Sequence, residues 1–319
     1  MSKSAVSRMW EDKSREQLAL VRERPLDQVR WLAVMIDGVF IGTNGCVVIA
    51  IGIDERGRKQ ALDFEAGDSE SQETVNRLIN RLKKRGVEAE KGSRLLVLRD
   101  GSKAIAGAVS RSWPDALQQG CLVHVERNIA DRLRRRDRSE SQRLFKCLRQ
   151  AEGQQAGEEA FEDLREFLAE RNAAAALALS DRAEEILCVH RLGIPATLNL
   201  SFLSTNMIEN VIRNWREHTN NVKRWTVKKD MIERWAASGL LWAEGGFRRI
   251  RHYEDCRNSG KPWRVRWWIR PPLQALRYAQ NLPFRPNPPA RSLLDHSDTT
   301  KHNDRTNHHP VLTISGTSP

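Results

Sequence analysis

The stretch Thr205-Asn-Met-Ile-Glu-Asn-Val-Ile-Arg-Asn-Trp-Arg216 has the pattern of an amphipathic helix. Ile208, Ile212 and Trp215 recur at helical spacing and predict a buried stripe. Asn206 is a candidate N-cap, with Glu209 three residues later as in a capping box. A second face carries Glu209, Arg213 and Arg216. Taken alone, that face indicates a capping acid beside solvated arginines.

Two aspartates follow apolar runs far upstream of this helix. Asp37 lies in Val-Met-Ile-Asp-Gly-Val, and Asp100 ends the run in Leu-Val-Leu-Arg-Asp-Gly-Ser. Either Asp-Gly pair alone indicates a turn at the end of a strand. With Glu209, however, two strand acids and one helix acid form the carboxylate set that a two-metal phosphoryl-transfer site uses. The three acids are therefore candidate catalytic and metal-binding residues.

The composition is that of a globular protein with a basic surface. Its 319 residues are 39% hydrophobic, which suffices for the core of one large or two ordinary domains. Residues 211–270 hold 15 of the 53 cationic side chains against 6 acids, and seven of the ten tryptophans. Such a segment is typical of a surface that follows a phosphate backbone and stacks on bases. Burial in the core is the alternative for Trp215, Trp235 and Trp242.

The cysteine spacing and the N-terminal sequence indicate the cellular compartment in which we expect the protein. The five cysteines have no paired spacing, so the sequence indicates neither a disulfide framework nor a four-cysteine zinc site. No apolar run approaches the roughly 20 residues of a membrane span, and the N-terminus has no signal-peptide pattern. We therefore expect a reduced cytoplasmic protein with no membrane partner.

The hydrophobic pattern predicts an α/β core built on a mixed sheet flanked by helices. Three antiparallel strands come first, and a buried parallel strand and a fifth strand follow. The predicted strands are 29–41, 46–53, 59–64, 94–99 and 116–125. The predicted helices around them are 15–22, 69–85, 103–113 and, after Arg270, one short helix.

A long helical block interrupts this core before the Glu209 helix. The pattern divides the chain into an N-terminal remnant, the first part of the core, an all-helical insertion, the second part of the core with a basic tryptophan-rich segment facing DNA, and a disordered tail. These parts are residues 1–28, 29–125, 126–198, 199–283 and 284–319.

The order of these elements resembles the ribonuclease-H-like fold, which places one acid on the first strand, one after the fourth strand and one on a later helix. Five local motifs are more specific, and from about residue 20 to residue 255 they resemble the mutator-type transposases of bacterial insertion sequences. The motifs are Ile36-Asp-Gly-Val39, Arg99-Asp-Gly-Ser-Lys-Ala104, Cys121-Leu-Val-His-Val-Glu-Arg-Asn128, Arg191-Leu-Gly-Ile-Pro195 and Thr205-Asn-Met-Ile-Glu-Asn210.

The resemblance implies that Asp37, Asp100 and Glu209 are an Asp-Asp-Glu triad for two Mg²⁺ (or Mn²⁺) ions. Asp37 would bridge both ions, with Asp100 on one and Glu209 on the other. The implied enzyme is a transposase that cuts phosphodiesters at element ends and joins the freed 3′-hydroxyls to target DNA. Its implied partners are the double-stranded DNA of the ends and the target, and further copies of the chain assembled on that DNA in the bacterial cytoplasm.

Cys121 and His124 match a Cys-x-x-His signature of that family, expected on the fifth strand. Two residues are too few for a zinc site, so His124 is expected to contact phosphate beside the metal site or to pack. The other signature residues are Arg127, Asn128 and Asn206. The DNA-binding candidates are His124, Arg213, Arg216, Lys223, Arg224, Lys228 and Lys229, with a solvated face as the alternative for the four after Arg216.

The N-terminus departs from the family pattern. Only 36 residues precede Asp37, whereas family members usually have a sizeable N-terminal region that includes a DNA-binding part. We therefore expect salt-sensitive DNA binding with little preference for terminal repeats. Two alternative functions stay open: an inactive, truncated relic that inhibits by binding DNA or full-length transposase, and a stand-alone ribonuclease-H-like nuclease.

Overall fold

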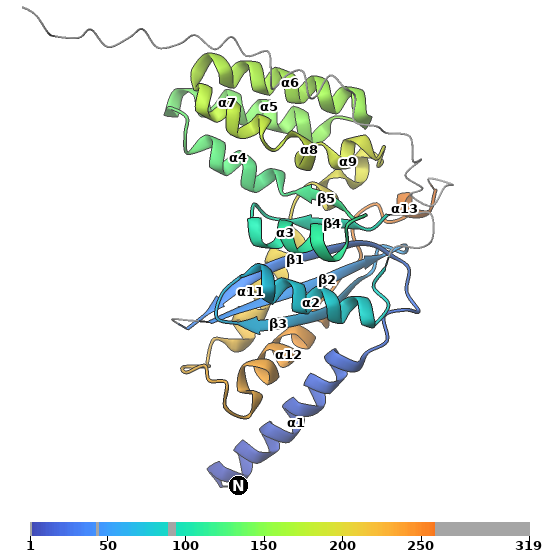
Figure 1. Cartoon of the computed structure of the whole chain (residues 1–319), viewed down its shortest axis with the longest axis vertical. Helices are drawn as coiled ribbons and strands as arrows, with labels where there is room; N and C mark the ends of the chain where they lie inside the picture. Colours follow the sequence, from blue (N-terminus) through green and yellow to red (C-terminus); the bar gives the residue numbers. More distant parts are fainter. Residues whose placement is uncertain (1, 43–44, 89–93, 259–319) are drawn as a thin grey trace, which may run out of the picture. The chain divides into compact units, whose positions relative to one another are not determined.

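A computed structural model describes residues 2–42, 45–88 and 94–258 (Figure 1). In this part of the chain, five strands form one mixed sheet in the order β3-β2-β1-β4-β5. β1, β2 and β3 pair antiparallel, while β4 pairs parallel with β1 and with β5. The strands are β1 Trp31–Ile41, β2 Gly45–Asp54, β3 Lys59–Gly67, β4 Leu96–Arg99 and β5 Leu117–Gly120. The predicted mixed α/β sheet is confirmed, and it is compatible with a ribonuclease-H-like fold.

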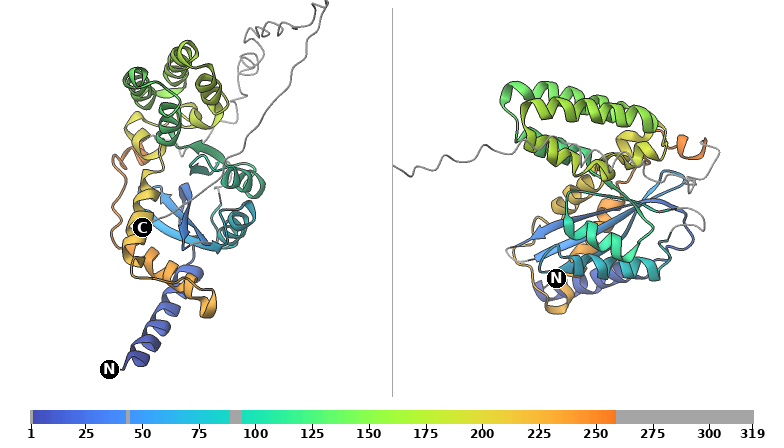
Figure 2. Two further views of the ribbon diagram at one scale, coloured as in Figure 1. Left: turned by 90° about the vertical axis from the view of Figure 1, so that its left-hand side faces the viewer. Right: turned by 45° about the horizontal axis from the view of Figure 1, so that its top comes forward.

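Helices cover both faces of the sheet (Figure 2). On one face α2 (Gln72–Lys84) and α3 (Lys103–Ser112) pack against even-numbered side chains of β1, such as Val34 and Ile36. On the other face lie α1 (Lys3–Glu23), α11 (Asn206–Thr219) and α12 (Met231–Glu244), which pack with the odd-numbered Met35 and Val39. Successive side chains of a strand point to opposite faces. Asp37 is therefore on the α11 side.

A block of helices lies between β5 and α11 in the chain. The buried side chains Phe145, Leu164 and Leu168 belong to its interior, and an ion pair between Arg99 of β4 and Glu185 joins it to the sheet. Its longer helices are α4 (Leu122–Ala130), α5 (Arg138–Gln150), α6 (Gly153–Arg171) and α7 (Ala173–Ser180). Its shorter segments are η1 (Arg135–Asp137), α8 (Ala183–Ile186), α9 (Cys188–Arg191), η2 (Ala196–Leu198) and α10 (Asn199–Phe202).

The first helix is longer than its pattern predicts. α1 begins at Lys3 rather than near residue 15, because α12 provides a surface for its first half. Trp10 of α1 lies against Trp235 of α12, with ring centroids 4.4 Å apart. The sequence before residue 15 is too polar to indicate this contact.

The fifth strand is shorter than predicted, and the expected placement of Cys121 and His124 on it is wrong. β5 pairs with β4 only from Leu117 to Gly120, opposite Leu96 to Arg99. Because β4 ends at Arg99, the chain beyond Gly120 has no partner strand and turns into α4. Cys121 takes the N-cap position of α4, and His124 lies in the first turn of that helix.

The start of α11 also differs from the expectation. Asn206 is the first helical residue and Thr205 takes the N-cap position, without a side-chain capping bond. The predicted cap by Asn206 is therefore wrong. Glu209 makes no capping box, because its carboxylate accepts a hydrogen bond from the Thr205 hydroxyl instead. The predicted buried stripe of Ile208, Ile212 and Trp215 is confirmed.

The segment after α11 is described only in part. It contains η3 (Lys228–Asp230), α12 and α13 (Asp255–Asn258). Trp215 is buried, but half of Trp242 is exposed, so the core position suggested for Trp242 is wrong. Residues 259–283, the short helix expected after Arg270 and the tail 284–319 lie outside the described residues. No helix among the described residues combines the length and apolar character that a membrane crossing requires.

Candidate active site

Asp37 and Asp100 occupy equivalent positions on neighbouring parallel strands. Ile36 of β1 is opposite Arg99 of β4, and this is the last pair between the two strands. The next residues are Asp37, still within β1, and Asp100, directly after β4. Asp100 enters the turn before α3, where its Oδ1 accepts a hydrogen bond from the Ser102 N–H at 2.9 Å. The register therefore places Asp37, in the interior of β1, level with Asp100 at the carboxyl end of β4. The carboxyl end of a parallel strand is a common place for ligand sites in α/β sheets.

Glu209 reaches the same place from the first turn of α11. Asp37, Asp100 and Glu209 all line one cavity of about 550 Å³. Arg213 and Arg216 line it as well, because residues four and seven positions after Glu209 lie on the same side of the helix. Both arginines are exposed, and neither forms an ion pair with a described acid. The rest of the lining is Gly38, His124, Ile212, Glu217 and Asn220.

The acids of this cavity affect one another electrostatically. Burial, and next the Asp100 carboxylate, raise the pKa of Asp37 to about 7, although a hydrogen bond from the Gly38 N–H opposes the shift. Glu70 and Glu209 add to the increase. Like charges near a partly desolvated acid disfavour its ionised form. The site therefore has an excess of negative charge that a cation would neutralise.

Glu70 is a further acid beside Asp37, outside the cavity lining, and no sequence pattern indicated it. It lies between β3 and α2, and a Cβ built on Gly38 would be only 2.1 Å from its Oε2. The Glu70 carboxylate therefore lies against the backbone beside Asp37. Burial raises the pKa of Glu70, a hydrogen bond with Ser102 opposes the shift, and the Asp100 carboxylate adds to it. A glycine after Asp37 indicated only a turn, whereas the structure uses it to admit this side chain.

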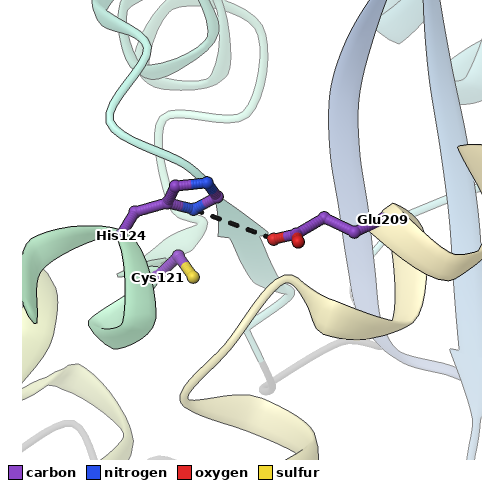
Figure 3. A group of neighbouring side chains, drawn as sticks. All are labelled: Cys121, His124 and Glu209. Carbon is purple, nitrogen blue, oxygen red and sulfur yellow. Dashed lines mark ion pairs between the residues drawn. The ribbon is translucent and has the colours of Figure 1, made fainter. Parts of the chain in front are cut away.

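Cys121, His124 and Glu209 form a group of neighbouring side chains (Figure 3), of which His124 and Glu209 line the cavity. One potential ligand atom from each lies within 4.8 Å of the others, and His124 Nδ1 is 3.8 Å from Glu209 Oε1. A hydrogen bond with Cys121 raises the pKa of His124, although burial opposes the shift, and the charges of Cys121, Glu209 and Asp100 add to it. Burial alone would raise the pKa of Cys121, but hydrogen bonds from His124 and Thr205 outweigh it and lower that pKa. A structural zinc ion takes four protein ligands, and this described group offers three.

The other candidate residues lie outside the cavity lining. Arg127 and Asn128 are exposed on α4, and Asn206 is exposed at the start of α11. The cations Lys223, Arg224, Lys228 and Lys229 are exposed in the connection from α11 to α12. Of these, Lys229 forms an ion pair with Glu11 of α1 at 3.3 Å.

The structure thus defines a class of protein that has a mixed α/β fold and a cavity lined by acids that would attract cations. The sequence model for "Transposase, Mutator family" matches residues 1–233. The chain therefore belongs to the Mutator family of transposases, and the resemblance seen in its motifs is confirmed.

Individual relatives are transposases for insertion sequence elements. The chain is 29% identical over 227 residues to the transposase for element IS905 of Lactococcus lactis subsp. lactis (strain IL1403), a match covering 68% of the chain and 53% of that protein. It is 33% identical over 179 residues to the transposase for IS1201 of Lactobacillus helveticus, covering 52% and 44%. It is 28% identical over 188 residues to the transposase for IST2 of Acidithiobacillus ferrooxidans, covering 59% and 62%. The chain spans about half the length of the curated relatives it matches.

Proposed function

We propose that this chain is the catalytic core of a transposase that cuts phosphodiester bonds at the ends of a mobile element and joins the freed 3′-hydroxyls to target DNA. The observation that carries the proposal is the convergence of Asp37, Asp100 and Glu209 on one cavity. These acids come from β1, from the residue after β4 and from α11, so only folding brings them together. Family membership and the names of the relatives support the same activity.

The three carboxylates fit divalent cations. Mg²⁺ and Mn²⁺ prefer oxygen ligands. Burial, and then the carboxylates of Asp100, Glu70 and Glu209, raise the pKa of Asp37 to about 7, and a bound cation would favour its ionised form. Asp37, Asp100 and Glu209 would hold two such ions. When bound, two ions stabilise the attacking and the leaving oxygen of a phosphodiester together.

The cations around the cavity would position the DNA. Arg213 and Arg216 line the cavity, and a guanidinium group can donate two parallel hydrogen bonds to a phosphate. His124 lines the same cavity, and its raised pKa favours the charged form that donates to a phosphate oxygen. Contacts of this kind position a duplex without reading its sequence.

We also propose that residues 126–198 are an insertion in a ribonuclease-H-like core whose two parts are 29–125 and 199–283. α11 packs with β1 although the whole helical block separates it from β5 in the chain. The Leu122 N–H at the start of α4 donates to the Leu203 carbonyl just after α10 at 2.8 Å. The block therefore leaves and rejoins the core at one place, as an insertion would.

A cleavage assay on the DNA ends of the element, with and without Mg²⁺, tests the function. We expect Asp100→Asn to abolish cleavage and to leave DNA binding intact, because the substitution removes a metal ligand and no phosphate contact. Neutralising one acid of the cavity could even strengthen DNA binding. Asp68→Asn, at an exposed acid between β3 and α2, is the matched control and should cleave like the unsubstituted chain.

Two results would count against this function. Cleavage by Asp100→Asn at the rate of the unsubstituted chain would remove Asp100 from the site. DNA binding without any cleavage by the unsubstituted chain would favour the inactive, inhibitory alternative.

A further inference from the structure

Thr205 stands at the N-cap position of α11 but does not cap the helix. Its side chain accepts no hydrogen bond from a backbone N–H of the first turn, although threonine is a common capping residue. The residue is fully buried, and its hydroxyl donates to Glu209 Oε1 at 2.8 Å. Thr205 therefore uses its only O–H to hold an acid of the cavity.

Two groups of the β5–α4 junction hold Thr205 in turn, and Figure 3 shows both beside Glu209. The Thr205 N–H donates to the Cys121 Sγ at 3.3 Å, and Nδ1 of His124 lies 3.4 Å from the Thr205 Oγ1. Because the hydroxyl proton goes to the carboxylate, Oγ1 acts as the acceptor for an N–H at Nδ1. Hydrogen bonds thus run from His124 through Thr205 to Glu209, while Cys121 fixes the Thr205 backbone.

These hydrogen bonds engage one carboxylate oxygen of Glu209 and leave the other oxygen available in the cavity. Oε1 is engaged by Thr205, whereas Oε2 has no hydrogen-bond partner within the described residues. A glutamate has three rotatable side-chain bonds, and ordering them costs conformational entropy. A hydrogen bond at Oε1 restricts these bonds before any ligand binds, so part of that cost falls on folding rather than on binding.

We propose that Thr205 is a positioning residue that, held by Cys121 and His124, orients the Glu209 carboxylate toward Asp37 and Asp100. This inference rests on the proposed function of the cavity. It gives the Cys-x-x-His pair a role that requires no zinc. Groups that hydrogen-bond to metal ligands typically contribute about 10-fold to 100-fold to metal affinity or activity.

The test measures the Mg²⁺ requirement of the full chain in two ways. One is the Mg²⁺ concentration for half-maximal DNA cleavage, and the other is the rise in melting temperature with Mg²⁺ alone. Thr205→Val removes the hydroxyl at nearly constant shape, and Thr205→Ser retains it. Thr219→Val is the matched control, because Thr219 is a buried threonine of the same helix whose hydroxyl donates to the Trp215 carbonyl at 3.0 Å.

We expect Thr205→Val to need about 10-fold to 100-fold more Mg²⁺ in both measurements. Thr205→Ser and Thr219→Val should need as much as the unsubstituted chain. The proposal is overturned if a folded Thr205→Val has an unchanged Mg²⁺ requirement, or if Thr219→Val shifts it equally.

Two further results keep the test decisive. If Thr205→Val does not fold, Cys121→Ala removes the acceptor of the Thr205 N–H and should shift the Mg²⁺ requirement in the same direction; no shift would overturn the proposal. Failure of the proposed function looks different, because either Asp100→Asn would then cleave as well as the unsubstituted chain, or the unsubstituted chain would not cleave at all. In that case the rise in melting temperature with Mg²⁺ alone still decides whether Thr205 supports cation binding.

Discussion

At the residue scale, Asp63 of β3 is fully buried and is paired with three arginines. Its Oδ1 lies 2.7 Å from Arg22 of α1, and its Oδ2 lies 2.7 Å from Arg81 and 3.1 Å from Arg85 at the end of α2. One carboxylate thus connects helices on both faces of the sheet to its edge strand. A buried charge loses its hydration and is tolerated only with such partners.

Replacing Asp63 should therefore destabilise the fold strongly. We expect Asp63→Ala to lower the free energy of unfolding by about 3 to 5 kcal/mol, because partly buried Arg22 and Arg85 lose their acidic partner and Arg81 keeps only Glu65. Urea unfolding followed by circular dichroism measures the change. The control Asp68→Ala removes an exposed acid and should change the value by less than about 0.5 kcal/mol. Equal losses in the two variants would contradict the role of Asp63.

At the element scale, His190 fixes α9 against α5 and α6. Its side chain is buried, and its Nε2–H donates to the Leu148 carbonyl at 2.9 Å. The ring lies so close to α6 that a Cβ on Gly157 would be 2.7 Å from it. Burial lowers the pKa of His190, although the hydrogen bond to Leu148 opposes the shift. Its Nδ1 is buried without a hydrogen-bond partner among the described residues, so protonation would leave a charge unsolvated.

The lowered pKa predicts acid sensitivity of the fold. Unfolded His190 should titrate near its ordinary pKa of about 6.5, so in acid the unfolded state binds more protons than the folded state. The stabilising contribution of neutral, buried His190 is present above about pH 6.5 and is lost as the pH falls below that value. We expect His190 to lower the free energy of unfolding as the pH falls below about 6.5, by at most about 1.4 kcal/mol per pH unit for one proton. The raised pKa of Asp37 contributes a change of opposite sign, so a variant of His190 isolates its share.

Urea unfolding at several pH values checks this prediction with a variant. His190→Gln removes the titrating ring and should reduce the slope of unfolding free energy against pH, whatever its effect on stability at neutral pH. The exposed His252 provides the control, since His252→Gln should keep the original slope. If His190→Gln also kept it, His190 would not be the group responsible.

At the scale of the whole molecule, positive charge is concentrated after Glu209. Residues 211–270 carry 15 cationic side chains against 6 acids. Within the described part of this segment, Arg213 and Arg216 line the acid cavity, and Lys223 and Arg224 are exposed in the connection that follows α11. Acids that would hold cations and arginines that would hold phosphates therefore share one cavity, and Glu209 shares α11 with both arginines.

Neutralising the two cavity arginines should weaken DNA binding in a salt-dependent way. Each phosphate contact contributes about 0.9 to the slope of log affinity against log salt. We expect the double variant Arg213→Ala, Arg216→Ala to bind random duplex DNA more weakly, with a slope smaller by about 2. Binding measured at several salt concentrations provides both numbers.

A control of equal charge separates this effect from net charge. Arg143 and Arg171 of the helical block are paired with acids of that block. The double variant Arg143→Ala, Arg171→Ala should keep the original salt slope. Identical slopes for the two double variants would show that only the total charge matters.

Local sequence patterns determined the elements and the family of this protein. The periodic Ile208, Ile212 and Trp215 are buried as predicted, because helical spacing places them on one face whatever lies opposite. The continuous apolar run before Asp100 is a buried parallel strand, because only a strand covered on both faces has no polar alternation. The ordered motifs indicated the family that the comparison confirms. The catalytic role of Asp37, Asp100 and Glu209 stays a prediction.

Only the tertiary structure decided which distant residues meet. The sheet register brings Glu70 against Gly38 and places Asp37 level with Asp100. The end of β4 stops β5, so that Cys121 begins a helix and its sulfur meets the Thr205 backbone. Each of these contacts joins residues from different elements, and its geometry depends on strand register and helix packing. A local pattern records the burial of its own residues, but it contains no information about the partner across the fold.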